Sequence, residues 1–176
     1  MNARRPFARS YRVQIMPTSS SSAADATDNV RVVPAVIGIV LRGRDVLLVR
    51  RANPPDAGRW GFPGGKIEAG EPIRDAVVRE LAEETAVKVE AVDVFTALDA
   101  FGRDDDGTLR QHFVMVAVLC RWLRGTPAAG DDALDARWFG VDELERRDDL
   151  PMSAGVVDVA RRAVERASAL AERPRR

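Results

Sequence analysis

The segment GKIEAGEPIRDAVVRELAEETAV, residues 65–87, decides the fold of this chain. Pro72 suits the first turn of a helix, because the N–H that proline lacks would have no partner there. Glu71, beside it, places a negative charge at the positive end of the helix dipole. The segment therefore predicts a helix that begins near residue 72, and Pro63 with the two glycines after it predicts a tight turn before that helix.

Three glutamates are expected on one side of this helix. Glu80, Glu83 and Glu84 are spaced i, i+3 and i+4, so their side chains should crowd the same two turns. Each like-charge neighbour destabilises an isolated helix by about 0.2–0.5 kcal/mol. A hard divalent cation such as Mg²⁺ prefers carboxylate oxygens and would turn this repulsion into ligation. The spacing therefore favours a metal site and phosphate chemistry over an ordinary charged surface helix.

The same segment resembles the signature of the Nudix hydrolases. Eight of the nine fixed positions of that signature are present, and they are Gly65, Glu71, Arg79, Glu80, Leu81, Glu83, Glu84 and Val87. The ninth position, normally glycine, is Ala86. A glycine suits a left-handed residue that closes the helix, so Ala86 must either adopt that conformation at some cost or let the helix end differently.

The resemblance implies a role for each charged position. It makes Glu80 and Glu84 the leading metal ligands, and Glu83 either a third ligand or the group that orients water. The carbonyl of Gly65 is a further expected ligand. Arg79 lies four residues before Glu83, close enough to pair with it and hold the cluster in position. The expected metal is Mg²⁺, with Mn²⁺ as a substitute.

In this family a further carboxylate from a remote loop often serves as the base. Asp131 and Asp132, in the loop before the RWF segment, are the best candidates. Asp99 and the acidic run at residues 104–106 are a second source, although such a run beside glycine is usually a solvated turn. His112 is the only histidine, and we expect a structural role for it or one at the edge of the substrate.

Basic and aromatic residues flank the expected site. Arg50, Arg51, Arg59 and Lys66 could meet phosphates, although for any one of them a solvated surface charge is the favoured explanation. Two aromatic residues, Trp60 and Phe62, could stack on a base, with packing beneath the glycine turn as the alternative.

The expected reaction is hydrolysis of a nucleoside diphosphate linked to another moiety, foremost ADP-ribose to AMP and ribose 5-phosphate. This rests on the segment GDDALDARWF, residues 130–139, which looks like that of small bacterial ADP-ribose pyrophosphatases. The first alternative is a nucleoside triphosphate pyrophosphohydrolase that removes oxidised nucleotides. Such enzymes read the purine partly through an asparagine near the last helix, and none stands near Ser153. The second alternative is a ligand-binding Nudix domain without catalysis, against which the intact glutamates argue.

The order of elements predicts an α/β fold. Strands are expected at residues 32–42 and 45–51, 89–97, 111–122 and 136–139, and helices from residue 142 and over residues 153–171. The strand at 111–122 is almost continuously apolar and should be central. A helix between strands and a second at the end indicate a mixed β-sheet flanked by helices. That arrangement agrees with the α/β/α sandwich that the Nudix resemblance implies over residues 33–150.

Composition divides the 176 residues into a leader and one domain. Residues 1–29 contain TSSSSAADATDN without periodicity and predict a disordered leader, with organellar targeting as the alternative, and residues 30–173 form the expected Nudix hydrolase domain. Lys+Arg and Asp+Glu both number 27, which argues against a nucleic-acid partner and leaves a small nucleotide as the expected ligand.

Hydropathy and cysteine content bear on location. The longest apolar stretch has ten residues, at positions 32–41, and is too short to span a bilayer. Cys120 is the only cysteine and lies in an apolar run, so we expect a buried thiol and a cytoplasmic location. The resemblance leaves the oligomeric state open between a monomer and the homodimer that is frequent in the family.

Overall fold

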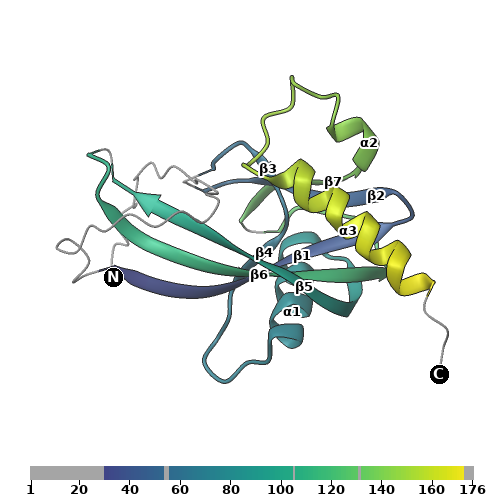
Figure 1. Ribbon diagram of the computed structural model, residues 1–176, viewed down its shortest axis with the longest axis horizontal. Coiled ribbons are helices and arrows are strands. Elements are labelled where there is room, and N and C mark those ends of the chain that lie inside the picture. The colour runs from purple at the N-terminus through teal and green to yellow at the C-terminus, as the bar shows by residue number, and fades with distance from the viewer. Residues whose placement is uncertain (1–29, 54–55, 105, 131, 173–176) are drawn as a thin grey trace.

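The computed structural model describes residues 30–53, 56–104, 106–130 and 132–172. The expected leader at residues 1–29, the candidate base Asp131 and Asp105 of the acidic run lie outside the described residues. Figure 1 shows a twisted sheet with helices packed around it.

The described part of the chain contains one sheet of seven strands and three helices. In chain order they are β1 (Arg31–Arg42), β2 (Asp45–Arg51), β3 (Trp60–Gly61), β4 (Gly64–Lys66), α1 (Ile73–Thr85), β5 (Lys88–Arg103), β6 (Leu109–Arg124), β7 (Ala133–Gly140), α2 (Val141–Leu144) and α3 (Val156–Ala171). The sheet order is β3-β2-β1-β6-β5, with β4 paired to β1 and β7 paired to β2. The β1–β6 pair is parallel and the other pairs are antiparallel. The sheet is therefore mixed, and β6 lies inside it, as predicted.

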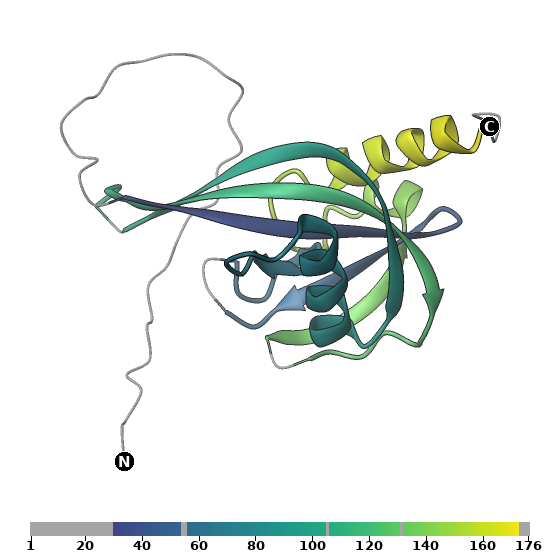
Figure 2. The same ribbon diagram turned by 90° about the horizontal axis from the view of Figure 1, so that it is seen from below.

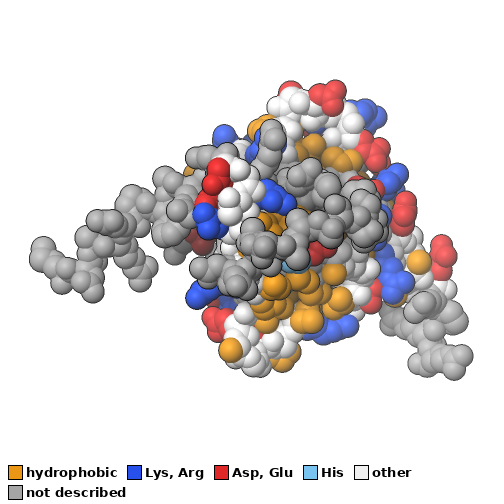
Figure 3. Space-filling model, turned by 60° about the vertical axis from the view of Figure 1, so that its left-hand side comes forward, with side chains coloured by type: hydrophobic (Ala, Val, Ile, Leu, Met, Phe, Trp, Pro, Cys, Tyr) orange, Lys and Arg blue, Asp and Glu red, His pale blue; other side chains and the backbone are white. Residues whose placement is uncertain are grey.

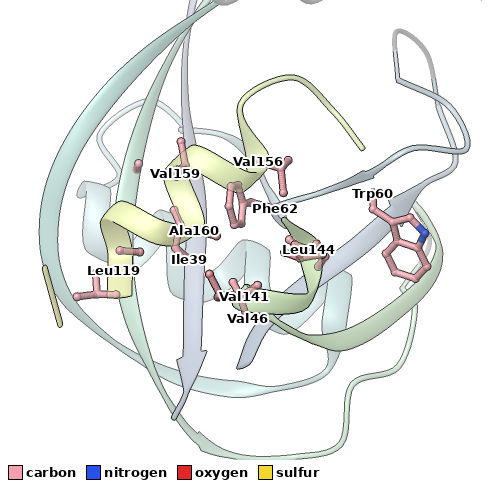
Figure 4. Close-up of a cluster of buried hydrophobic side chains, with 13 residues drawn as sticks. Ile39, Val46, Trp60, Phe62, Leu119, Val141, Leu144, Val156, Val159 and Ala160 are labelled. Atoms are coloured by element: carbon pink, nitrogen blue, oxygen red, sulfur yellow. The ribbon is translucent and has the colours of Figure 1, made fainter. Parts of the chain in front are cut away.

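Helices α1 and α3 cover opposite faces of the sheet (Figure 2). Because successive strand residues point to opposite faces, β1 contributes to two cores. Ile39 packs with residues of α3 such as Val159 and Ala160 (Figure 4). Val36 and Val40 pack with Leu81 of α1. This layering confirms the α/β/α sandwich.

Gly38 allows α1 to pack closely on β1. A Cβ added at Gly38 would lie 2.6 Å from Cδ1 of Leu81, so the leucine side chain occupies the space that a side chain on the strand would need. Leu81 is fully buried. The helix that carries the glutamates is thus held against the sheet by one of its own signature residues.

Strand β4 brings the glycine turn to the same place. Its residues pair with β1 in the register Val36 to Gly65 and Ile37 to Gly64. Gly64 has φ 154°, and a Cβ on it would lie 2.2 Å from the carbonyl oxygen of Val36. Only glycine fits this approach, because both the backbone conformation and the available space exclude a side chain.

The hairpin of β5 and β6 is longer than expected. Strand β5 continues to Arg103 and strand β6 begins at Leu109. Figures 1 and 2 show the hairpin extending from the body of the molecule. The predicted strands at 89–97 and 111–122 were too short, since the backbone pairing continues beyond them to the pair of Arg103 and Leu109. Hydrophobic side chains also gather on the face shown in Figure 3.

The other differences are small. Helix α3 begins at Val156 rather than near residue 153, because Gly155 has a left-handed φ of 77° and forms its N-cap. Cys120 is buried, as predicted, and burial raises the pKa of its thiol to about 12. None of the helices in the described part of the chain has both the length and the apolarity to cross a bilayer.

Replacement of Leu81 should destabilise the protein strongly. We expect Leu81→Ala to lower the free energy of unfolding by about 2–5 kcal/mol, because it opens a cavity between α1 and β1. Leu123→Ala is the matched control, since that leucine is 52% exposed, and it should change stability by less than about 0.5 kcal/mol. Urea denaturation of both variants measures the difference. Equal effects would contradict the proposed packing of α1.

Candidate metal and phosphate site

Two glutamates of α1 face the glycine turn. The side chain of Glu80 is 14% exposed, and a Cβ added at Gly65 would lie 2.4 Å from its Oε2. The half-buried Glu84 accepts a hydrogen bond of 2.9 Å from the N–H of Gly64. The absence of a side chain on Gly65 therefore lets the backbone of β4 approach Glu80, and the N–H of Gly64 binds Glu84.

Arg79 holds the acidic groups around it. Its guanidinium donates to both carboxylate oxygens of Glu71 at 2.8 Å. It also donates to Glu80 at 2.8 Å, to Glu83 at 3.2 Å and to the carbonyl of Lys66 at 3.2 Å. The predicted pairing of Arg79 with Glu83 is confirmed. One guanidinium thus ties the segment before the helix, β4 and the last turns of α1 together.

The surroundings of Glu71 and Glu84 shift the pKa values of these two carboxyl groups in opposite directions. Hydrogen bonding to Arg79 is the main reason that the pKa of Glu71 falls to about 2. Burial is the main reason that the pKa of Glu84 is raised, and the negative charges of Glu80 and Asp132 raise it further. The hydrogen bond from the Gly64 N–H and the positive charge of Arg51 lower it, but by less. Glu71 is therefore a fixed anion, whereas Glu84 is a carboxylate that lacks a nearby cation strong enough to offset its desolvation.

The donor set fits a hard divalent cation. Among the residues that the structure describes, no three acidic, histidine or cysteine side chains are already gathered as a closed metal site. Mg²⁺ does not need one, since it is usually held by one or two carboxylates and keeps several waters. Glu80 and Glu84 can supply those carboxylates, and both line the cleft beside the backbone of Gly65.

The carboxylates open onto a cleft of about 500 Å³. Seven of the residues singled out in the sequence line it, and they are Arg51, Phe62, Gly65, Lys66, Glu80, Glu84 and Asp132. With Asp56, which also lines it, the described cleft combines two basic side chains with four carboxylates. Asp132 accepts a hydrogen bond of 2.9 Å from Nδ2 of Asn53, which fixes its orientation.

Four other candidates do not line this cleft. Arg50 donates to the carbonyl of Gly58 at 3.1 Å and Arg59 to the carbonyl of Met152 at 2.9 Å. Trp60 is buried with its ring 4.8 Å from that of Phe139, so the packing alternative describes its position. Glu83 is 61% exposed and accepts from the same Nη1 of Arg79 as Glu80 does, so it lies at the solvent side of the cluster.

The second carboxylate source lies elsewhere. Asp99 is 2.7 Å from Nε2 of His112, and neither residue lines the cleft. Asp106 accepts from the backbone N–H of Thr108 at 2.9 Å, which agrees with a turn between β5 and β6. Asp132 is therefore the described base candidate that the structure brings to the glutamates.

Sequence reasoning missed the far wall of the cleft. Asn53, Gln111 and Ser153 line it together with apolar residues of β5 and β6 such as Phe113. Oγ of Ser153 is buried and has no hydrogen-bond partner among the residues that the structure describes. Only alternation along β6 could have indicated that Gln111 and Phe113 share a face, and nothing local linked that face to α3.

Comparison with known proteins identifies the family. The sequence pattern of the NUDIX domain matches residues 32–158. The chain belongs to the NUDIX family. Its signature is the segment from Gly65 to Val87, with Ala86 in place of the usual glycine, and Ala86 adopts the left-handed conformation with φ 57°.

Individual NUDIX relatives differ in their names. An ADP-ribose pyrophosphatase of Methanocaldococcus jannaschii is 33% identical over 112 residues, which are 64% of this chain and 64% of that protein. A Mycobacterium tuberculosis protein provisionally named 8-oxo-dGTP diphosphatase 2 is 39% identical over 128 residues, 72% of this chain and 86% of that protein. The structure of the MutT NUDIX hydrolase from Burkholderia pseudomallei matches with a TM-score of 0.62 and 27% identity, covering 77% of this chain and 97% of that one.

The ion pair of Arg79 and Glu71 should make the stability of this NUDIX domain depend on pH. The lowered pKa of Glu71 stabilises the fold at neutral pH, and the stabilisation is lost as the pH falls from about 4, where an unfolded glutamate titrates, toward about 2. We expect metal-free Glu71→Gln to melt below the wild type at pH 7 and to approach it near pH 3. Glu68→Gln, an exposed neighbour, is the control. A gap that does not change with pH would contradict the assignment.

Proposed function

We propose that this chain is a metal-dependent pyrophosphohydrolase that cleaves a nucleoside diphosphate linked to another moiety, foremost ADP-ribose to AMP and ribose 5-phosphate. The observation that carries the proposal is the cleft in which Glu80 and Glu84 face Arg51 and Lys66. Carboxylates that can bind a metal and cations that can bind phosphate are what hydrolysis of a phosphoanhydride needs. The name of the archaeal relative supports the choice of ADP-ribose.

The residues take different parts in this reaction. Arg51 and Lys66 bind the negative diphosphate oxygens. Bound Mg²⁺, or Mn²⁺ in its place, supplies further positive charge at those oxygens, and Glu80, Glu84 and the Gly65 carbonyl are the groups proposed to hold it. Glu83, at the solvent side of α1, is proposed as the group that orients water or completes the metal ligands.

Asp132 is the proposed base. It accepts a proton from water as the water oxygen forms a bond to one phosphorus, while the bond between that phosphorus and the bridging oxygen breaks. Each product then carries a phosphate. The hydrogen bond from Asn53 leaves the second oxygen of Asp132 available for the proton. Arg79 takes no proton and holds Glu80 and Glu83 in place.

The remainder of the cleft suits a nucleoside. A volume of about 500 Å³ lies within the range of about 300–1,000 Å³ that is usual for small ligands. Phe62 and Phe113 give apolar surface for a base or sugar, and Gln111 and Ser153 are the polar groups beside them. The described residues of this wall include few charged groups, which agrees with a neutral nucleoside.

Hydrolysis of an oxidised nucleoside triphosphate is the second candidate. The mycobacterial relative, which this chain covers to a larger extent than the archaeal one, has a name of that kind. Gln111 and Ser153 offer the polar groups that could read a modified base. A purely ligand-binding NUDIX domain is the third candidate, and the intact pair of Glu80 and Glu84 argues against it.

We keep a small nucleotide as the proposed partner and the cytoplasm as the proposed compartment. The balanced charge and the single buried thiol of Cys120 support these proposals. Dimerisation stays a prediction that sedimentation of the purified chain can test.

Glu84→Gln should nearly abolish turnover and preserve the fold. Glutamine can still accept from the Gly64 N–H but cannot bind a cation as a carboxylate does, so we expect kcat to fall by about 10²-fold or more. Because burial raises the pKa of Glu84, removal of its charge should also raise the metal-free melting temperature. Glu165→Gln, on the exposed side of α3, is the control. Wild-type turnover by Glu84→Gln in Mg²⁺ would leave α1 as an ordinary surface helix.

The substrate proposal predicts a preference for ADP-ribose. We expect kcat/KM for ADP-ribose to exceed that for 8-oxo-dGTP and dGTP under the same Mg²⁺ concentration, with AMP and ribose 5-phosphate as products. A cleft whose described neutral polar side chains are Asn53, Gln111 and Ser153 should separate similar bases by about 10–200-fold at most. Identification of products by chromatography decides the question. A clear preference for a triphosphate, with release of pyrophosphate, would select the second candidate.

A further inference from the structure

The loop before β7 closes the end of the helix that carries the glutamates. The backbone N–H of Ala128 donates to the carbonyl of Thr85 at 3.0 Å, and that of Gly130 donates to the carbonyl of Glu84 at 2.9 Å. Carbonyls in the last turn of a helix have no partner within the helix. The loop therefore supplies two of the partners that the end of α1 needs.

Gly130 lies too close to α1 to carry a side chain. A Cβ on it would be 2.1 Å from the carbonyl oxygen of Glu83 and 3.0 Å from Cα of Glu84. Both are backbone atoms, which cannot rotate away. Gly130 is not among the described glycines with positive φ, so the requirement is for space and not for a backbone conformation. Its contact sets how closely the loop can approach the two glutamates.

The same loop carries Asp132 into the cleft. The N–H of Ala133 donates to the carbonyl of Gly130 at 3.1 Å, which links Gly130 to the residue after Asp132. The carbonyl of Asp132 accepts from the N–H of Ala52 at 3.1 Å, and its side chain accepts from Asn53 at 2.9 Å. Asp132 is thus anchored on one side by α1 and on the other by the end of β2.

We propose that Gly130 is a positioning residue: its side-chain-free contact with α1 sets the distance between Asp132 and Glu84, and Asn53 sets the orientation of the Asp132 carboxylate. This rests on the proposed function, in which Asp132 accepts the proton of water. Displacement of a reacting group by about 1 Å can slow an enzyme about 10²-fold. Helix α1 is anchored by Ala76, Val77 and Leu81 in the core, so a methyl group on Gly130 should move the loop and leave the helix in place.

The test is a double-mutant cycle between Gly130→Ala and Asp132→Asn, with ADP-ribose and Mg²⁺. We expect Gly130→Ala alone to lower kcat by about 10–100-fold with KM changed less than about threefold. In the Asp132→Asn background it should lower kcat by less than about twofold further, because the group that it positions is already disabled. Equal effects in both backgrounds would show a general structural role and overturn the proposal.

Binding of Mn²⁺ without substrate gives a second readout. If the loop moves and α1 does not, calorimetry should find the Mn²⁺ affinity of Gly130→Ala within about threefold of the wild type. A loss of affinity parallel to kcat would mean that Gly130 acts through the glutamates, which overturns the role of Asp132. Gly43→Ala is the matched control: Gly43 has φ 65° with nothing near its Cβ position and does not line the cleft, so its strain should leave kcat within about twofold.

A further variant keeps the proposal falsifiable if Gly130→Ala fails to fold. Asn53→Ala removes an exposed hydrogen bond and should fold. It should lower kcat about 3–10-fold in the wild type and have no further effect in Asp132→Asn. Additive effects would overturn the proposal. If Asp132→Asn alone leaves kcat unchanged while Glu84→Gln is inactive, this inference is refuted and the proposed function still stands. If the wild type hydrolyses no phosphoanhydride, the proposed function itself is refuted.

Discussion

The site depends on one guanidinium. Arg79 binds Glu71, Glu80, Glu83 and the carbonyl of Lys66 together, so it joins the segment before α1, the glycine strand and the last turns of the helix. Without this cation, three anions and a carbonyl would face one another across a small region. Arginine suits the position better than lysine, since its planar fork can bind the two oxygens of Glu71 side by side and still donate to Glu80. The acidic groups left for a metal are then the ones that Arg79 does not fully neutralise.

Local sequence patterns predicted most of the fold. Helix α1 and the hairpin of β1 and β2 depend on neighbours in the chain, namely Pro72 at the start of the helix and the turn at Gly43, and both lie within one or two residues of their expected bounds. The parallel pairing of β1 with β6 joins residues that are about 80 positions apart, such as Val36 and Val116. No pattern within either strand encodes that partner. Gly38 could not be explained from the local sequence either. A glycine is needed there because the side chain of Leu81 fills the adjacent space, and not because the chain turns.

The candidate site was predictable where it depended on the signature, and less so elsewhere. Glu80, Glu84, Gly65 and the nearby Arg51 and Lys66 come together because the signature helix and strand β4 share one neighbour, β1. Trp60 stands next to the site in sequence, but its ring packs in the core against Phe139. Its neighbour two residues on, Phe62, lines the cleft. The wall formed by Gln111 and Ser153 needed the tertiary structure, since β6 and the segment before α3 meet only after the sheet has formed.

Ala86 shows how the departure from the usual signature is accommodated. It is the one non-glycine residue with positive φ in the described part of the chain, and a left-handed alanine costs roughly 1–2 kcal/mol relative to its favoured conformation. The strain is held because its N–H still bonds to the carbonyl of Ala82 and because the loop from residue 125 to residue 130 donates to the last carbonyls of α1. Gly125 passes within van der Waals reach of the same turn, where an added Cβ would lie 3.1 Å from the carbonyl oxygen of Ala86. The loop that leads to Asp132 therefore also holds the strained end of the helix that carries the glutamates.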